Sequence, residues 1–421
     1  MLARSLGLDE LPRRMRPLAA GGSLSAVGSG LWFTIWVLYL TQRVGLSGGQ
    51  AGAALSIAGA VGFCSPTPLG RLADRRGPRE VYAVLLAAEG LAVLGFLVCR
   101  SFAAVVVIAA ATAACDQGKT GVRAALVSQL APVEGRVGAL ACLRSCAHAG
   151  DAVGAGLGAL VIALGSGPAY GVAIAFNGVS YLAYAVVLHW VPHVPPCAGS
   201  HQGRRLGAFR DLPYTSLAAI CAVLTLCWGL LSAGLPLWIV THTRAPHALA
   251  GVVVLISSIS IAGLQVRFSR GAETPRRASV AALRSGLSLA ACCILFAVAA
   301  GPAAPAATAL LLAGAAAHVL GELWFVAAAW GLSVPLMPPE RPAEYQGVFA
   351  TGEALAIMLS PALMTGAIVP AGVTGWLLLG LGFASAGLAA RPTARWAVRT
   401  RPTKHENDGR APGSQPGCTP P

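Results

Sequence analysis

The fold of this chain is decided by a short basic stretch, Gly70-Arg71-Leu72-Ala73-Asp74-Arg75-Arg76-Gly77-Pro78-Arg79. Apolar runs of about twenty residues lie on both sides of it, which is the length that a helix needs to cross a hydrocarbon core of about 30 Å. The stretch is therefore predicted to be a tight loop between two membrane-spanning helices. Its glycines permit a reversal of the chain, and its arginines favour the cytoplasmic side of the membrane.

The composition of the chain indicates the same class of protein. Hydrophobic residues make up 56% of the 421 residues and charged residues 11%, whereas about 25% of a soluble domain is charged. The apolar runs lack the alternation of polar and apolar residues that a membrane β-barrel requires. We therefore predict an all-α membrane protein with twelve transmembrane helices, over residues 18–40, 49–69, 80–98, 102–126, 138–164, 169–190, 213–240, 248–266, 278–300, 304–332, 347–369 and 372–390.

Two polar segments divide the chain into predicted domains. Residues 191–212 are rich in Pro, Gly, Arg and His, and we expect them to be a cytoplasmic linker between a six-helix bundle at 1–190 and a second one at 213–391. Residues 392–421 are basic and then rich in Pro and Gly, which is typical of a disordered cytoplasmic tail. The first apolar run, at 18–40, is too long for a signal peptide and is interpreted as the first helix.

The positions of Lys and Arg predict the orientation in the membrane. With the N-terminus in the cytoplasm, 26 of the 30 Lys and Arg residues fall on the cytoplasmic side, and only Arg43, Arg100 and Arg244 fall on the opposite side. This excess follows the positive-inside rule and places both termini in the cytoplasm. The net charge of +14 is then a consequence of topology and does not indicate nucleic-acid binding. The basic loops are expected to contact anionic lipid headgroups.

The pattern G-x-L-A-D-R-x-G-x-R in the basic stretch resembles the signature loop between the second and third helices of major facilitator superfamily transporters. The resemblance covers about residues 15–390 and implies two pseudo-symmetric six-helix bundles with the substrate bound near the membrane midplane. It assigns a gating role to Gly70, Asp74, Arg75, Gly77 and Arg79. Asp74 is expected at the positive N-terminus of a helix from the other half. A solvated basic turn in another kind of membrane protein is the alternative.

Two further segments are similar to motifs of the same superfamily. A second copy of the loop is expected after the eighth helix, and Gly263-Leu264-Gln265-Val266-Arg267-Phe268-Ser269-Arg270-Gly271 has Arg267 where the aspartate would be. Only Asp74 is therefore carried over as a gating carboxylate. In the fifth helix, Gly150-Asp151-Ala152-Val153-Gly154-Ala155-Gly156-Leu157-Gly158 resembles a motif associated with exporters, with Ala155 in place of its proline. A glycine-rich packing face explains these residues as well, and both interpretations stay open.

Charged residues inside the predicted spans are costly and usually mark a functional cavity or a partner. They are Glu89, Asp116, Lys119, Arg144, Asp151, Glu322 and Glu353, with His148 and His318 as titratable neighbours. In the fold that the resemblance implies, the first, fourth, seventh and tenth helices line the cavity. Asp116 and Glu322 then lie on the cavity side, about 13–15 Å from the cytoplasmic surface. The proton-coupling candidates are Asp116, Lys119, Arg144, Asp151 and Glu322.

Asp116 is the first choice among these candidates. It shares a helical face with Lys119, three residues away, so the two side chains can pair. In the functional interpretation Asp116 binds a proton or cation, and Lys119 or Arg144 expels it because a nearby cation favours the ionised carboxylate. A static charge lock between the fourth and fifth helices is the alternative. Glu89 is expected to be structural because its helix is peripheral in the implied fold.

Aromatic residues gather on the helices expected to line the cavity. Trp32 and Trp36 share a face of the first span, and the seventh and tenth spans add Trp228 and Trp324. These four are the substrate-cavity candidates, and a cavity of this kind suits an amphipathic or partly aromatic solute. Placement at the membrane interface is the alternative for tryptophan, and it is what we expect of Trp330.

The predicted function is proton-coupled export of small amphipathic molecules, such as drugs or metabolites. The alternatives are an importer or symporter of a small solute and a non-transporting sensor or assembly protein of the same fold. No phosphate-binding loop, nucleophile elbow or zinc spacing occurs among the motifs, so we expect no enzyme, catalytic residue, metal or cofactor. The abundance of Arg, Ala and Gly with almost no Lys favours a high-GC bacterial genome, and hence a location in the bacterial inner membrane. We expect the protein to be a monomer.

Overall fold

The computed structural model describes residues 7–9, 11–196, 207–247 and 249–401, and all regular elements in these ranges are helices. The first half contains α2 (Arg16–Leu38), α3 (Gly48–Cys64), α4 (Pro66–Arg76), α5 (Pro78–Gly95), α6 (Phe102–Leu130), α7 (Arg136–Leu164) and α8 (Gly167–Val187). The second half contains α9 (Leu212–Thr225), α10 (Cys227–Gly229), α11 (Leu235–His242), α12 (Leu249–Ser269), α13 (Pro275–Val298), α14 (Ala304–Leu336), α15 (Pro342–Leu363) and α16 (Gly372–Arg399).

The helices account for the predicted spans. In the described residues, ten helices or joined helices are long and apolar enough to cross a membrane, and α3 with α4, bent by 42°, makes an eleventh if the pair is one span. α5 is not among them because its 18 residues include Arg79, Glu80 and Glu89. Since α5 lies between two spans and packs on α6 and α8, we count it as the twelfth. The protein is a multi-pass membrane protein with the predicted all-α fold.

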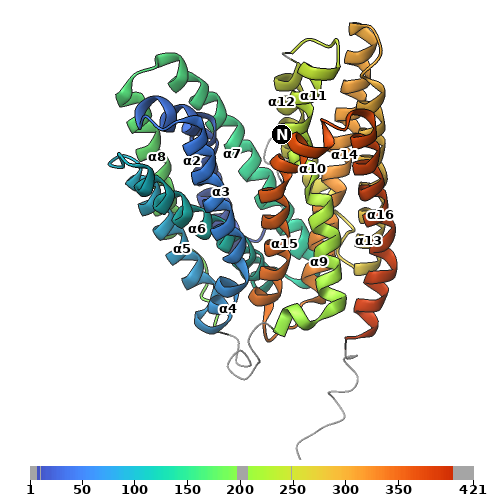
Figure 1. The fold of residues 1–421 in the computed structure, drawn as a ribbon. Helices are drawn as coiled ribbons and strands as arrows, with labels where there is room; N and C mark the ends of the chain where they lie inside the picture. The colour runs from blue at the N-terminus through green and yellow to red at the C-terminus, as the bar shows by residue number, and fades with distance from the viewer. Residues whose placement is uncertain (1–6, 10, 197–206, 248, 402–421) are drawn as a thin grey trace, which may run out of the picture.

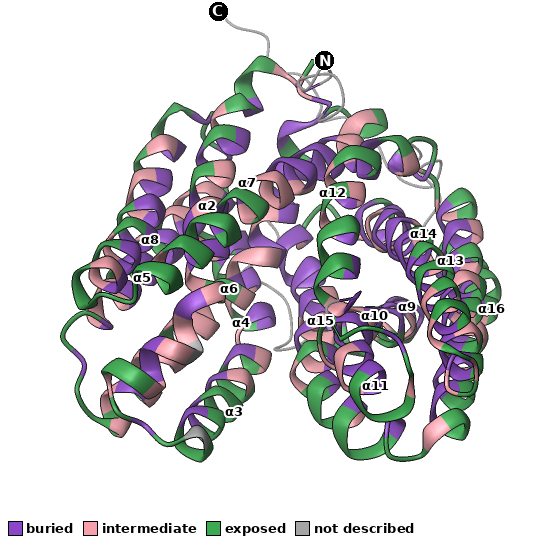
Figure 2. Cartoon of the chain, turned by 90° about the horizontal axis from the view of Figure 1, so that it is seen from above, coloured by how far each residue is buried: buried purple, intermediate pink, exposed green. Residues whose placement is uncertain are grey.

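The two halves lie side by side as separate groups of helices (Figure 1). α2 packs on α7 and α8 in the first half, and α13 packs on α14 and α16 in the second. Seen from above, buried residues fill the inside of each group and exposed residues form the outside (Figure 2). Each half has its own core, which includes Tyr82 and Leu86 in the first and Trp238 and Phe383 in the second.

Matching pairs of glycines bring helices together in both halves. A Cβ atom at Gly90 of α5 would lie 2.7 Å from the carbonyl oxygen of Gly178 in α8. A Cβ atom at Gly286 of α13 would lie 2.9 Å from the Cα atom of Gly387 in α16. Small residues allow this approach, and close packing is what holds membrane helices together because lipid provides no hydrophobic drive between them.

The halves meet at one end of the molecule, which we call the arginine-rich end and which holds the C-terminus of α4 and the N-terminus of α15. There α15 packs on α4 and α6, and α12 packs on α7. The two groups of helices converge toward this end and diverge toward the other (Figure 1). Residues of α4, α6 and α7 therefore face residues of α12, α14 and α15 across the junction.

The structure differs from the sequence predictions in the basic stretch. Gly70 to Arg76 belong to helix α4, not to a loop, and only Gly77 lies outside a helix. Gly77 has a φ angle of +97°, which side chains other than glycine rarely adopt. Pro78 then begins α5, a position that suits proline because its missing N–H is not needed there. One residue thus makes the whole turn.

Other boundaries also differ. α16 continues to Arg399, past residue 391 where a tail was expected to begin, because Ala394 and Ala397 are buried against the second half. Residues 402–421 and the central part of the expected linker, 197–206, lie outside the described residues. The seventh span is broken into α9, α10 and α11, with a π-helical turn at Leu230–Gly234.

Candidate functional site

Asp74 joins the two halves at the arginine-rich end. Its side chain is 2% exposed, and its two oxygens accept hydrogen bonds from the backbone N–H groups of Ala343, at 2.9 Å, and Glu344, at 2.8 Å. These donors belong to the first turn of α15, where N–H groups have no partner within the helix. The positive end of the helix dipole adds to the attraction. The carboxylate thus lies at a helix N-terminus of the other half, as the sequence leads one to expect.

Glycines allow the backbones to approach around this contact. A Cβ atom at Gly70 would overlap the carbonyl oxygen of Ala343, and one at Gly347 would lie 2.8 Å from the carbonyl oxygen of Pro66. The hydroxyls of Thr67 and Thr351 are 3.0 Å apart across the same junction. We call this surface, formed by Pro66–Asp74 and Ala343–Thr351, the α4–α15 contact.

The other residues of the basic motif do not converge on Asp74. Arg79 donates to the carbonyl oxygen of Val191 at 2.8 Å and pairs with Glu80 at 3.1 Å, so it joins α5 to the segment after α8. Glu80 also contacts His193 at 2.8 Å. Arg75 is exposed. The motif therefore has two parts: Gly70 and Asp74 touch the other half, whereas Gly77 and Arg79 shape the turn and hold it to the first half.

A second group of charges lies within the first half. The Lys119 ammonium is 2.6 and 2.8 Å from the two carboxylate oxygens of Glu89 and 3.0 Å from Asp116. It also lies over the ring of Tyr181, 4.5 Å from its centroid. Glu89 is buried, whereas the side chain of Asp116 is 54% exposed. The pairing of Asp116 with Lys119 was predicted, but no sequence pattern indicates that Glu89 of α5 is the closer partner.

A third group of charges crosses from one half to the other. The Arg144 guanidinium of α7 is 2.8 Å from a carboxylate oxygen of Glu322 in α14. The indole N–H of Trp228 in α10 donates to the same oxygen at 2.8 Å, and Arg144 lies 5.2 Å from the Trp228 ring. Glu322 is 4% exposed. Arg144 was one of the two cations expected to expel a proton from Asp116, but it forms this ion pair with the tenth span instead. We call these three residues the Arg144–Glu322–Trp228 cluster.

The remaining titratable candidates do not join these clusters. Asp151 is half-buried on α7, and the described part of the chain provides no ion pair to its carboxylate. His318 is buried, and its Nε2 atom is 2.8 Å from the carbonyl oxygen of Cys227. His318 therefore contacts the backbone of α10 and not Glu322, one turn along its own helix. No group of three or more His, Cys, Asp or Glu within the described ranges is arranged to hold a metal ion.

The four cavity tryptophans are not brought together. Trp228 alone takes part in a charged cluster. Trp32 packs on Phe96, with ring centroids 4.9 Å apart, and Trp36 is half-buried against the core of the first half. Trp324 lies against Phe268, with centroids 5.6 Å apart, and near Arg284 of α13. Trp324 therefore faces the neighbouring spans of its own half.

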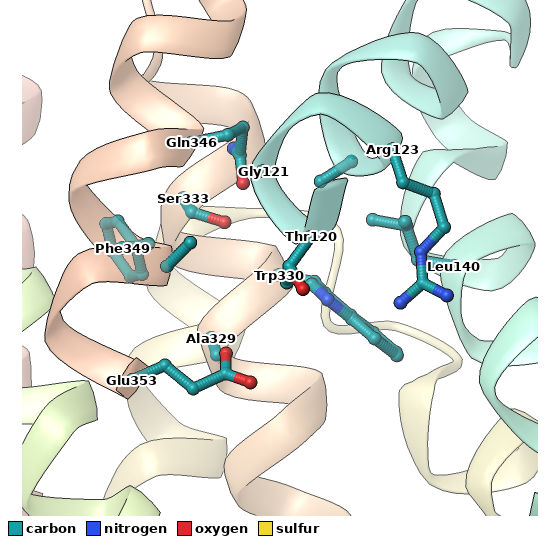
Figure 3. Close-up of a pocket in the computed structure, with 12 residues that line it drawn as sticks. Thr120, Gly121, Arg123, Leu140, Ala329, Trp330, Ser333, Gln346, Phe349 and Glu353 are labelled. Carbon is teal, nitrogen blue, oxygen red and sulfur yellow. The ribbon is translucent and has the colours of Figure 1, made fainter. Parts of the chain in front are cut away.

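A small pocket of about 60 Å³ lies between the halves, toward the arginine-rich end. Arg123 and Leu140 contribute to it from the first half, and Trp330, Gln346 and Glu353 from the second. The ring of Trp330 points from α14 toward Arg123 and Leu140 (Figure 3). Trp330 was expected at the membrane interface, and here it lines the junction between the halves. Glu353 was recognised as a charge inside a span, but no local pattern indicates that it faces the other half.

Comparison with known proteins agrees with this architecture. The sequence profile of the Major Facilitator Superfamily matches residues 18–361. This range includes the basic motif and both Arg144 and Glu322. The chain belongs to the Major Facilitator Superfamily. Among proteins of curated function, none matches this sequence.

Solved structures of Major Facilitator Superfamily type share the fold at low sequence identity. A bacterial homologue of the iron transporter ferroportin in an outward-facing state is 17% identical, with a TM-score of 0.69, over 92% of this chain and all of the other. The human organic anion transporter MFSD10 is 16% identical, with a TM-score of 0.64, over 92% and 100%. The transporter FucP in its outward conformation is 16% identical, with a TM-score of 0.65, over 91% and 98%.

The glycine-rich segment of the fifth span has a packing role in this superfamily member. A Cβ atom at Gly158 would lie 2.7 Å from the Cβ atom of Thr34, and Cβ atoms at Gly150 and Gly154 would meet backbone atoms of α2. The segment thus holds α7 tightly on α2, which agrees with the packing interpretation. Its relation to the exporter motif stays a prediction.

Proposed function

We propose that this transporter exports small amphipathic molecules in exchange for protons, with Glu322 as the proton site. The family is one of transporters, so the proposal concerns the direction, the coupling ion and the substrate class. The observation that carries it is the Arg144–Glu322–Trp228 cluster, a buried ion pair whose two charges belong to different halves.

The ion pair links protonation to the movement of the halves. Rocking of the halves about the substrate site must separate Arg144 from Glu322, and separating a buried pair leaves each charge without a partner at a cost of about 3–5 kcal/mol. A proton on Glu322 removes the carboxylate charge and with it most of this cost. A proton taken up while the arginine-rich end is closed would therefore favour its opening. Water that enters the opened end solvates the carboxylate and favours its ionised form, so the proton can leave there, and renewed pairing with Arg144 then favours closure.

Asp116 is the second candidate for the proton site. Its partner Lys119 lies on the same helix, and Glu89 belongs to the same half. Movement of the halves does not by itself separate these three charges, so their interaction is expected to change less during transport. We therefore infer that this group is a static charge lock, which is the structural alternative for Asp116 and Lys119.

The surroundings of the cluster support the proposed substrate class. Trp228 stacks edge-on with Phe325, with ring centroids 5.8 Å apart, and presents its indole beside a single ion pair. Aromatic walls with few charges suit an amphipathic solute. The excess of arginine at the arginine-rich end supports its assignment to the cytoplasm, together with both termini. We further propose that the protein acts as a monomer in a bacterial inner membrane.

The proposal predicts that Glu322→Gln abolishes proton-driven uptake of an amphipathic dye, ethidium, into inside-out vesicles. Glutamine keeps a hydrogen-bond acceptor for Trp228 but cannot lose a proton, so the half-cycle that releases the proton stops. The measurement is the fluorescence of ethidium after a pH gradient, acid inside, is imposed. Exchange of ethidium across the membrane without net proton movement should survive.

Matched variants distinguish the possible sites. Glu340→Gln removes an exposed carboxylate outside the spans and should leave uptake unchanged. If Asp116→Asn stops uptake and Glu322→Gln does not, the proton site belongs to α6. If both variants accumulate ethidium as the wild type does, the coupling mechanism is wrong at both sites.

A further inference from the structure

A basic groove lies at the arginine-rich end between the first turn of α13 and the last turns of α16. Its volume is about 290 Å³, close to the lower limit of about 300 Å³ for small-molecule pockets. Arg276 contributes from α13, and Arg391, Arg395 and Arg399 contribute from α16. Among the residues that the structure describes, no acidic side chain lines it. We call it the α13–α16 groove.

The arginines of the groove repel one another. Arg391, Arg395 and Arg399 are spaced four residues apart, so they project from one face of α16, and like charges at this spacing destabilise a helix. All four are exposed, and no ion pair joins any of them to a carboxylate in the ranges that the structure describes. A bound anion would relieve this repulsion.

The helix dipoles explain only part of the arrangement. Cations are favoured at a helix C-terminus, which accounts for Arg395 and Arg399 near the end of α16. Arg276 is different, because it lies in the first turn of α13, where the dipole repels a cation and attracts an anion. The groove therefore combines four guanidinium groups with the positive end of a long helix, and both favour the same negatively charged occupant.

The surroundings of the groove place it at the level of lipid headgroups. Trp396, next to Arg395 on α16, is 45% exposed, and exposed tryptophans near span ends are typical of the membrane–water interface. Farther along the same two helices, Leu388 of α16 is 61% exposed and Leu287 of α13 is 50% exposed. An occupant with a negative headgroup and apolar chains would match both the charged groove and the apolar surface beside it.

We propose that the α13–α16 groove binds the phosphate headgroup of an anionic phospholipid. Arginine suits this role because its planar fork donates two hydrogen bonds to one phosphate. Basic pockets between membrane helices on the cytoplasmic side bind anionic headgroups in this manner. The site belongs to the outer face of the second half and does not depend on proton coupling or on the direction of transport. Its occupant holds α13 and α16 together at their charged ends.

The test is binding of a defined lipid to the purified full-length protein in a neutral detergent. Dioleoyl-phosphatidylglycerol is titrated, and bound lipid is counted by native mass spectrometry while the melting temperature is followed. The variant Arg276→Gln/Arg395→Gln should bind this lipid roughly 25-fold more weakly, about five-fold for each arginine. The variant Arg276→Lys/Arg395→Lys keeps the positive charge but lacks the planar guanidinium group. Its affinity for the lipid should lie between those of the wild type and the Gln double variant. Arg13→Gln/Arg14→Gln removes the same charge from exposed residues outside the groove and should bind as the wild type does.

Several outcomes would overturn the proposal. Equal loss in both Gln double variants, or none in either, would show that the groove is not the site. Dioleoyl-phosphatidylcholine binding as tightly as the anionic lipid would remove the charge preference. Stabilisation by inorganic phosphate at the same concentration, with competition against the lipid, would assign the groove to a soluble anion.

Discussion

The two copies of the basic motif meet the opposite half in different ways. In the first copy, Gly70 lies against the backbone of Ala343, and Asp74 accepts two hydrogen bonds from the start of α15. In the second copy, a Cβ atom at Gly263 would meet open space, and Arg267 is exposed. The pseudo-symmetric sequence positions therefore do not make pseudo-symmetric contacts.

The electrostatics of helix ends explain the difference. An aspartate at the N-terminus of α15 is attracted by the free N–H groups, whereas an arginine in the same relation to the N-terminus of α7 would be repelled. The second copy meets α7 through Ala272, which packs on Val137, and Glu273 lies near Glu134 of the turn that precedes α7. We infer that closure of the arginine-rich end depends mainly on the first copy.

The largest expected effect is that of Gly70→Ala. Its Cβ atom would overlap a backbone carbonyl that cannot rotate away, so α4 and α15 must separate, and overpacking of this kind costs about 1–3 kcal/mol. Closure of the arginine-rich end is measured as the yield of a disulfide between cysteines introduced by Thr67→Cys and Thr351→Cys. The hydroxyls of the native threonines are 3.0 Å apart. We expect a fall of roughly ten- to a hundredfold in the closed population. Gly263→Ala is the matched control and should not change the yield.

The next effect is that of Asp74→Asn, which keeps one acceptor oxygen and turns an NH₂ group toward the other N–H. Loss of a hydrogen bond to a charged group costs about 1.5–3 kcal/mol, so closure and transport turnover should both fall about tenfold while expression is maintained. Arg267→Gln changes the equivalent position of the second copy and should have little effect. A comparable loss in Arg267→Gln would contradict the asymmetry, and normal turnover in Asp74→Asn would remove the gating role of the carboxylate.

The smallest effect is that of Glu273→Gln in the second copy. Burial raises the pKa of Glu273 from its usual value of 4.5, and the charge of Glu134 raises it further. Because the folded protein holds this proton more tightly than the unfolded chain, the wild type loses stability as the pH rises from 4.5 through the raised pKa. The variant lacks this loss and should melt at a slightly higher temperature at neutral pH, by about 1 °C or less for a screened pair.

The pH profile provides the control for this prediction. At pH 4 the melting temperatures of the wild type and Glu273→Gln should coincide, and they should diverge as the pH increases. Glu134→Gln removes the other carboxylate and should shift the profile in the same direction. A difference that is the same at every pH would mean that packing of the side chain, and not its charge, is responsible.

Much of the fold follows from local sequence. Apolar runs set the spans, Gly77 and Pro78 set the turn of the first motif, and three-residue spacing sets the Asp116–Lys119 pair. These features depend on neighbours along the chain, which is why sequence patterns predict them. Local sequence also predicts a loop at 70–76, because the charges interrupt the apolar run there, although the amphipathic pattern continues the helix.

The sequence by itself determined a polytopic helical membrane protein of this superfamily, since hydropathy, arginine positions and a motif are all readable in one dimension. Only the tertiary structure decided the partners of the buried charges. Lys119 joins Glu89 across thirty residues, and Arg144 joins Glu322 across the two halves. Such pairs depend on the rotation and depth of packed helices, which small residues and close contacts fix in three dimensions.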